Sequence, residues 1–195
     1  MNLFLDLMYQ LLTSPRQAFR VLTRGERLRQ AGALWLFVVF LLSLTSLADG
    51  AGLGTAFFLC LLGMGILLFL HSAVIDYCAG LLGGSGTAKG ITAGFMAASF
   101  PYAFLVFGGL LSVFGGMGES LLGYAVFLWS FALDVLAVSE NYRFSTGKAL
   151  AVALIPAALF ILAAACFFFL GLFAAVSGLA QMEDLGAAAG VLQSL

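Results

Sequence analysis

Long apolar runs separated by short polar stretches divide the chain from residue 31 onward. The longest run, from Ala149 to Ala180, contains thirty-two residues and no charged side chain. An α-helix rises about 1.5 Å per residue, so roughly 20 residues cross a hydrocarbon core of about 30 Å. The pattern therefore predicts membrane-spanning helices, because no water-soluble domain needs an uncharged run of this length.

Five spans are expected, and glycine and polar residues typical of turns separate them. Pro101 lies inside the third apolar run and predicts a kink there, because proline cannot donate a backbone hydrogen bond. The fifth run, which contains Pro156, is long enough to tilt or to protrude from the bilayer. The predicted spans are 31–48, 54–82, 90–114, 121–138 and 149–175, with connections at 49–50, 83–89, 115–120 and 139–148.

The first 30 residues have a different pattern and predict two short amphipathic helices. Apolar residues recur at helical spacing over the first thirteen positions, with Asp6 and Gln10 elsewhere on the helix. Ser14 and Pro15 then suit the start of a second helix, which is expected to end near Gly25. Both helices are too short to span, and we expect them to lie at the membrane surface.

The amino-acid composition narrows the structural class of the protein. The chain is 63% hydrophobic and 9% charged, whereas ordinary soluble domains are about 25% charged. The runs do not alternate as the strands of a membrane barrel do. The expected fold is therefore an all-α polytopic membrane protein: interfacial helices over 1–30, one membrane domain over 31–180, and a short extracytoplasmic tail over 181–195.

Charge indicates the orientation of the spans. If five spans are threaded in order, all eight basic residues fall on one side of the membrane, while Asp49, Glu119, Glu183 and Asp184 fall on the other. Cytoplasmic loops are enriched in lysine and arginine, so we expect a cell-membrane protein with a cytoplasmic N-terminus and a C-terminus outside. The net charge of −1 does not favour a nucleic-acid partner.

Five of the basic residues lie together before the first span and could contact anionic lipid head groups. Alternatively, they serve only as a topology signal. They are Arg16, Arg20, Arg24, Arg27 and Arg29.

Three polar residues inside the spans are candidates for chemistry: His71, Asp76 and Asp134. The second and fourth spans run in the same direction, which places the two carboxylates at similar depth. Intramembrane carboxylates are costly and usually face the bundle interior or water, so a shared proton or cation site is one interpretation. Structural pairing with nearby cations is the other. A lone histidine in a helix bundle, such as His71, is more often a hydrogen-bonded structural residue. The candidate cations are Lys89, Arg143 and Lys148.

Small residues repeat every fourth position at Gly90, Gly94 and Ala98, and again at 149, 153 and 157. Such ridges let helices approach closely, either within the chain or in a homodimer. Enzyme motifs are missing: the sequence has no GxxxxGK[ST], HExxH, GxSxG or CxxC pattern. The three cysteines suit apolar packing, and we expect no catalytic residue, cofactor or metal.

Several short motifs occur in a familiar order. Ser14, Pro15 and Phe19 precede the basic stretch; then come a Gly-Gly-x-Gly turn, Pro101-Tyr102, Trp129, a Lys-Ala-Leu, and Pro156. The chain resembles the prokaryotic branch of the YIP family, an integral membrane domain first named for partners of Rab-type GTPases. The resemblance implies five spans and a cytoplasmic N-terminus, and it supplies no catalytic residue. The long N-terminal region of eukaryotic members has no counterpart here, so a GTPase-recruiting role is not expected.

Two functions follow as hypotheses. The first is a non-enzymatic multi-pass protein that organises the membrane or binds lipids, other membrane proteins or a second copy of itself. The alternative is a small proton or cation transporter or channel that uses the intramembrane carboxylates.

Overall fold

The computed structural model describes residues 3–24, 27–45, 50, 52–111 and 116–193. Every element in these residues is helical, and five segments are long and apolar enough to cross a membrane. This confirms the predicted all-α polytopic membrane fold. The elements are α1 (Leu3–Thr13), α2 (Pro15–Arg24), α3 (Leu28–Thr45), α4 (Leu53–Leu81), α5 (Ala88–Ala98), the 3₁₀ helix η2 (Phe100–Phe107), α6 (Gly108–Leu111), α7 (Gly116–Tyr142) and α8 (Thr146–Gln193).

The chain forms two compact units, residues 1–155 and 156–195. The second unit is the part of α8 that begins at Pro156, and its large apolar side chains from Leu159 to Phe173 are exposed. Exposed apolar side chains are what lipid requires of a span. The helix continues to Gln193, through most of the segment that the sequence analysis assigned to a short tail.

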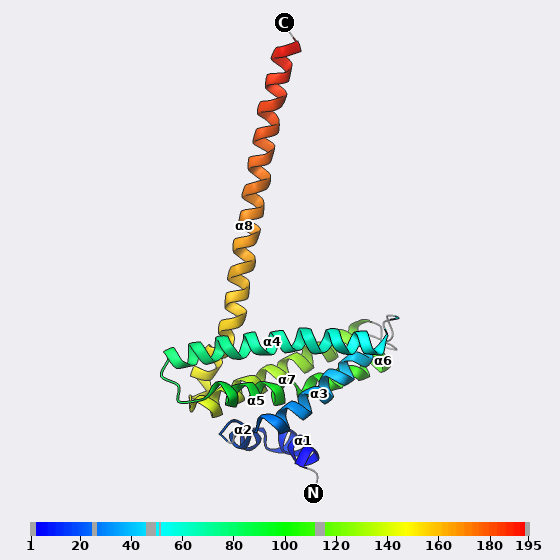
Figure 1. Cartoon of the computed structure of the whole chain (residues 1–195), viewed down its shortest axis with the longest axis vertical. Coiled ribbons are helices and arrows are strands. Elements are labelled where there is room, and N and C mark those ends of the chain that lie inside the picture. Colours follow the sequence, from blue (N-terminus) through cyan, green and yellow to red (C-terminus); the bar gives the residue numbers. More distant parts are fainter. Residues whose placement is uncertain (1–2, 25–26, 46–49, 51, 112–115, 194–195) are drawn as a thin grey trace. The chain divides into compact units, whose positions relative to one another are not determined.

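The first unit is a bundle in which α3 packs against α4, α5 and η2, and α5 packs against α7 (Figure 1). Its core contains small and β-branched side chains such as Val38, Ile75, Ile91 and Val138. The outer face of α4 instead exposes long apolar side chains, including Phe69. This arrangement suits a hydrocarbon solvent, in which outward-facing apolar groups carry no penalty.

The third span is broken at its proline, as the sequence predicts. Helix α5 ends at Ala98, and η2 begins at Phe100 with Pro101 in its first turn. Proline lacks the N–H that would continue the α-helical bonds, and the tighter 3₁₀ geometry follows. The predicted end of this span, residue 114, lies outside the described residues.

The predicted limits of the fourth span are wrong at both ends. Helix α7 runs from Gly116 to Tyr142, so most of the segment 115–120 and the first part of 139–148 are helical rather than connecting loop. At its C-terminus, Arg143 adopts a left-handed backbone (φ 58°), and the Phe144 N–H bonds to the Ser139 carbonyl at 3.1 Å. This pattern closes a helix, and it shows that the polar residues before it complete the last helical turn.

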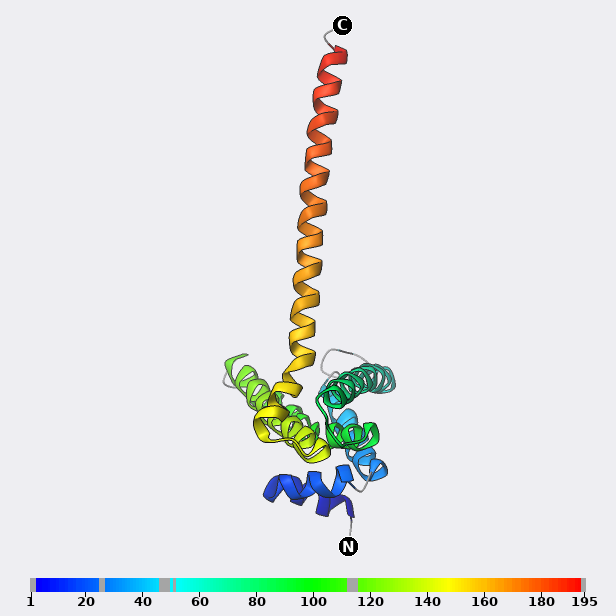
Figure 2. The same ribbon diagram turned by 90° about the vertical axis from the view of Figure 1, so that its left-hand side faces the viewer.

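The two N-terminal helices form as predicted and lie together on one side of the bundle (Figure 2). Helix α2 packs against α5 and α7, and its apolar residues Ala18, Phe19 and Leu22 are buried there. Helix α1 packs on α2 and α3. The amphipathic pattern of α2 therefore describes a helix whose apolar face is covered by protein.

The small-residue ridge of α5 is used within the chain. A Cβ at Gly94 would lie 2.8 Å from the Cβ of Ala137 in α7, and a Cβ at Gly90 would lie 2.7 Å from the Thr23 carbonyl oxygen in α2. The carbonyl of Ala98 accepts a 2.9 Å hydrogen bond from Ser130 of α7. Close backbone approach at this ridge lets α2, α5 and α7 meet.

Candidate functional site at the basic end of the bundle

Four consecutive polar residues end α7: Ser139, Glu140, Asn141 and Tyr142, here called the α7 terminal cluster. All four are buried. Successive side chains on an α-helix point about 100° apart, so each of the four faces a different neighbour. Buried polar groups need hydrogen-bond partners, and each member of the cluster finds one on a different part of the chain. The Ser139 hydroxyl, for example, donates to the Phe144 carbonyl at 2.9 Å.

Glu140 is surrounded by three arginines from α2. Its carboxylate lies 3.4 Å from Arg16 Nε, 3.1 Å from Arg20 Nε and 3.7 Å from Arg24 Nη2. The arginines are four residues apart and so share one face of α2. The Glu140 side chain is 8% exposed, whereas the arginine side chains are 58%, 53% and 46% exposed. One carboxylate thus anchors a row of three guanidinium groups that still reach solvent.

Asn141 fixes the turn between α4 and α5. Its Nδ2 donates to the Thr87 carbonyl at 3.0 Å, and the Thr87 hydroxyl caps α5 by accepting from the Gly90 N–H at 3.0 Å. The glycine-rich turn packs tightly against the cluster: a Cβ at Gly86 would lie 2.6 Å from Asn141 Nδ2. The Gly-Gly-x-Gly sequence is therefore explained by close packing against α7.

Tyr142 joins α7 to α4. Its hydroxyl donates a 2.6 Å hydrogen bond to Asp76 Oδ1, and its ring stacks on Phe144 with centroids 5.8 Å apart. The Lys148 ammonium lies 4.3 Å from the centre of the Phe144 ring and donates to the Leu82 carbonyl at 2.6 Å. Asp76 is thus bound by a tyrosine, and Lys148, one of the predicted cations, binds a helix carbonyl.

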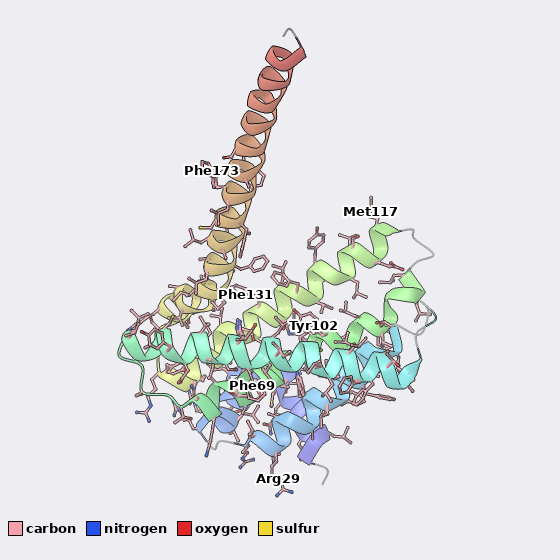
Figure 3. All side chains as sticks on the ribbon, turned by 45° about the horizontal axis from the view of Figure 1, so that its top comes forward. Arg29, Phe69, Tyr102, Met117, Phe131 and Phe173 are labelled. Carbon is pink, nitrogen blue, oxygen red and sulfur yellow. The ribbon has the colours of Figure 1, made fainter. Side chains whose placement is uncertain are left out.

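Asp134 lies on α7 at a different height from the α7 terminal cluster. It precedes Tyr142 by eight residues, which places it about 12 Å away along the helix axis. Its neighbour Tyr102 of η2, labelled in Figure 3, interacts with the charge of Asp134 and hydrogen-bonds Ser130. Within the described chain, no hydrogen bond or ion pair links Asp134 to Asp76. The structure therefore does not bring the two predicted carboxylates together.

His71 packs against α5. Its ring meets the Phe95 ring edge-on, with centroids 4.5 Å apart. His71 Nε2 and the hydroxyl of its neighbour Ser72 are buried with no hydrogen-bond partner. The described residues contain no group of three or more His, Cys, Asp or Glu side chains arranged to bind a metal.

The five predicted lipid-contacting arginines separate into two sets. Arg16, Arg20 and Arg24 form the row on Glu140. Arg27 and Arg29 are exposed at the start of α3, and Arg29 extends away from the helices in Figure 3. Glu26, which precedes them, lies outside the described residues.

Sequence reasoning missed Glu140, Asn141 and Tyr142 because it placed them in a connecting loop. One signal was available. Arg16, Arg20 and Arg24 recur every four residues, which indicates a single charged helix face. Glu140 is the one carboxylate beside the later basic residues Arg143 and Lys148, all within the predicted loop 139–148. Together these patterns favour an interaction between the two segments.

A family model, the Yip1 domain, matches residues 9–168. No curated protein and no solved structure matches the chain. The matched region runs from the second half of α1 into α8 and includes the α2 arginines, Asp76, Asp134 and the whole α7 terminal cluster. Because the match covers most of the chain and agrees with the motifs and the five spans, this protein belongs to the Yip1 family.

Proposed function

We propose that this integral membrane protein is non-enzymatic and organises the cell membrane by binding anionic lipid at one end of its bundle. The observation that supports this proposal is the way in which α2 packs on the bundle. Its apolar face is buried on α5 and α7, and its arginines remain about half exposed on the outside. Arg27 and Arg29, exposed at the start of α3, add two further cations next to this row. Exposed arginines fixed on a membrane domain are suited to contact lipid head groups.

Contacts among the described residues bring several cationic side chains together at the end of the bundle where α7 terminates, here called the basic end. Arg16 reaches Thr146 at the start of α8, and Lys148 reaches Leu82 after α4. Lys89 lies in the first turn of α5, next to the bound Thr87. The positive-inside rule then supports a cytoplasmic N-terminus and a C-terminus outside.

Helix α1 supplies an apolar contact for the same surface. Leu5, Tyr9 and Leu12 are exposed and are spaced four and three residues apart, so they form one stripe. Leu7 and Leu11, on the other side of the helix, are buried. An outward apolar stripe with a tyrosine suits the boundary between head groups and acyl chains.

The test uses the full chain in nanodiscs that contain equal amounts of phosphatidylcholine and phosphatidylglycerol. After release, native mass spectrometry counts the lipids that remain bound. We expect the parent protein to retain phosphatidylglycerol preferentially, and the double variant Arg27→Gln/Arg29→Gln to lose a twofold or larger part of that preference. The matched control, Arg27→Lys/Arg29→Lys, keeps both charges and should keep the preference. Equal retention of the two lipids by the parent would overturn the proposal.

One observation favours proton or cation transport as a second candidate. Asp134 is a half-buried carboxylate within a span and lies beside Tyr102, and such residues are often functional. Reconstituted protein should then pass protons or Na⁺, and Asp134→Asn should abolish the flux while Glu119→Asn does not. No flux in the parent protein would remove this candidate. We centre this candidate on Asp134, because the Asp76 carboxylate already accepts a hydrogen bond from Tyr142.

A further inference from the structure

The arginine row has more positive charge than its partner neutralises. Arg16, Arg20 and Arg24 contribute three charges and Glu140 removes one, which leaves 3 − 1 = +2 within these four residues. Three cations at one carboxylate repel one another, and an additional anion relieves that repulsion. The row is therefore an anion site that its own carboxylate fills only in part.

The helix that carries the row is held in place before any ligand arrives. Phe19 and Leu22, which lie between the arginines in sequence, are 0% and 1% exposed, so α2 cannot turn without exposing its apolar face. Arginines four residues apart are about 6 Å apart along the helix axis. A rigid row loses less conformational entropy on binding than free side chains do.

The arginines also keep donors available. Arg16 and Arg20 both contact Glu140 through Nε. Arg16 Nη2 donates to Thr146 at 3.4 Å, while the side chain of Arg20 remains 53% exposed. A planar guanidinium presents several N–H donors that match phosphate oxygens in pairs.

We infer that Arg16, Arg20 and Arg24, together with Glu140, form a binding site for a phosphate monoester, the head group of a phosphatidic acid-type lipid. A monoester dianion balances the charge of +2, whereas a diester monoanion leaves half of that charge unbalanced. The choice of a lipid rests on the proposed function, because α2 adjoins the exposed apolar stripe of α1. Glu140 is the positioning residue: it aligns the guanidinium groups and contacts no ligand.

The experiment measures binding to the full chain in phosphatidylcholine nanodiscs by thermophoresis. The probes are short-chain phosphatidic acid, short-chain phosphatidylglycerol and glycerol 3-phosphate. We expect phosphatidic acid to bind at least tenfold more tightly than phosphatidylglycerol. Arg20→Lys retains the charge and loses the paired donors, so it should reduce that ratio severalfold. The matched control Arg143→Lys, at an exposed arginine outside the row, should leave the ratio unchanged.

Each result has a defined meaning. Equal binding of the two lipids, or an Arg20→Lys ratio equal to that of the parent, would overturn the site. If glycerol 3-phosphate binds as tightly as phosphatidic acid, the site recognises a phosphate monoester, and its ligand is a water-soluble phosphate rather than a lipid. Equal retention of phosphatidylglycerol and phosphatidylcholine by the parent protein, with an intact monoester preference, would refute the general lipid proposal alone. Circular dichroism of the Arg20→Lys variant verifies that it is folded.

Discussion

The hydroxyl of Tyr142 donates a 2.6 Å hydrogen bond to Oδ1 of Asp76, and this bond ties the end of α7 to the last two turns of α4. The two residues are 66 positions apart. The bond explains why the chain can place a carboxylate in this span: a hydroxyl donor compensates for the lost water. The bond thus gives the Asp76 carboxylate a partner within the bundle at the basic end.

Replacing Tyr142 with Phe should destabilise the bundle, because the partly buried Asp76 carboxylate then loses its hydrogen-bond donor. We expect a loss of about 1–3 kcal/mol in the free energy of unfolding, measured by denaturant titration in detergent. Tyr124→Phe is the control, since Tyr124 is also on α7 and is 70% exposed. In a double-mutant cycle with Asp76→Asn, the two effects should be non-additive by about 0.5 kcal/mol or more. Additive effects would argue against the bond.

Replacing Glu140 with Gln should loosen α2, because three arginines then face one another without their shared carboxylate. We expect a loss of about 1–3 kcal/mol, below the 3–5 kcal/mol typical of buried pairs, since the arginines are half exposed. Hydrogen exchange at the amides of residues 18–24 should accelerate. Glu119→Gln, an exposed carboxylate at the start of α7, should leave exchange in α2 unchanged.

Replacing Gly94 or Gly90 with Ala should separate α5 from its neighbours. The added Cβ at Gly94 would meet Ala137, and the one at Gly90 would meet Asn141 Oδ1 and the Thr23 carbonyl. We expect each change to cost about 1–3 kcal/mol by overpacking, measured as the loss of unfolding free energy. Gly63→Ala on α4 is the control, because nothing lies within 4 Å of that site. The control should be neutral or raise stability by about 0.5–1 kcal/mol.

Two serines at helix contacts should respond oppositely to removal of the hydroxyl. Ser130 donates to the Ala98 carbonyl at 2.9 Å, so Ser130→Ala should cost about 1 kcal/mol. The Ser72 hydroxyl is buried with no partner, so Ser72→Ala should be neutral or stabilising. Thermal unfolding of the two purified variants compares them directly. A marked loss of stability in Ser72→Ala would show that its hydroxyl has a partner after all.

Hydropathy predicted the membrane spans well because it measures how apolar a segment is, and a segment inside lipid must be apolar. The second predicted span, 54–82, differs by one residue at each end from α4 (Leu53–Leu81). The same measure misplaced the end of α7, because Ser139–Tyr142 are polar and yet complete a buried helical turn. Buried polar residues can complete a helix, and sequence polarity alone does not show where that helix ends.

The candidate site was predicted less well, for a related reason. The arginines of α2 were visible as a charged cluster, but their partner Glu140 is contributed by a segment 120 positions away from Arg20. Such a contact depends on how the spans pack, which local periodicity does not encode. Asp76 and Asp134 were placed at similar depth from span direction alone, and the structure puts each beside a different tyrosine.

The separation of Arg20 from Glu140 along the chain has a consequence for biosynthesis. A ribosome releases the N-terminal helices first, and the carboxylate that they dock on emerges 120 residues later. During that interval three complete spans are made, and α2 can pack against α5 but not yet against α7. Assembly of the basic end is thus a late event, completed only when the fourth span is in place.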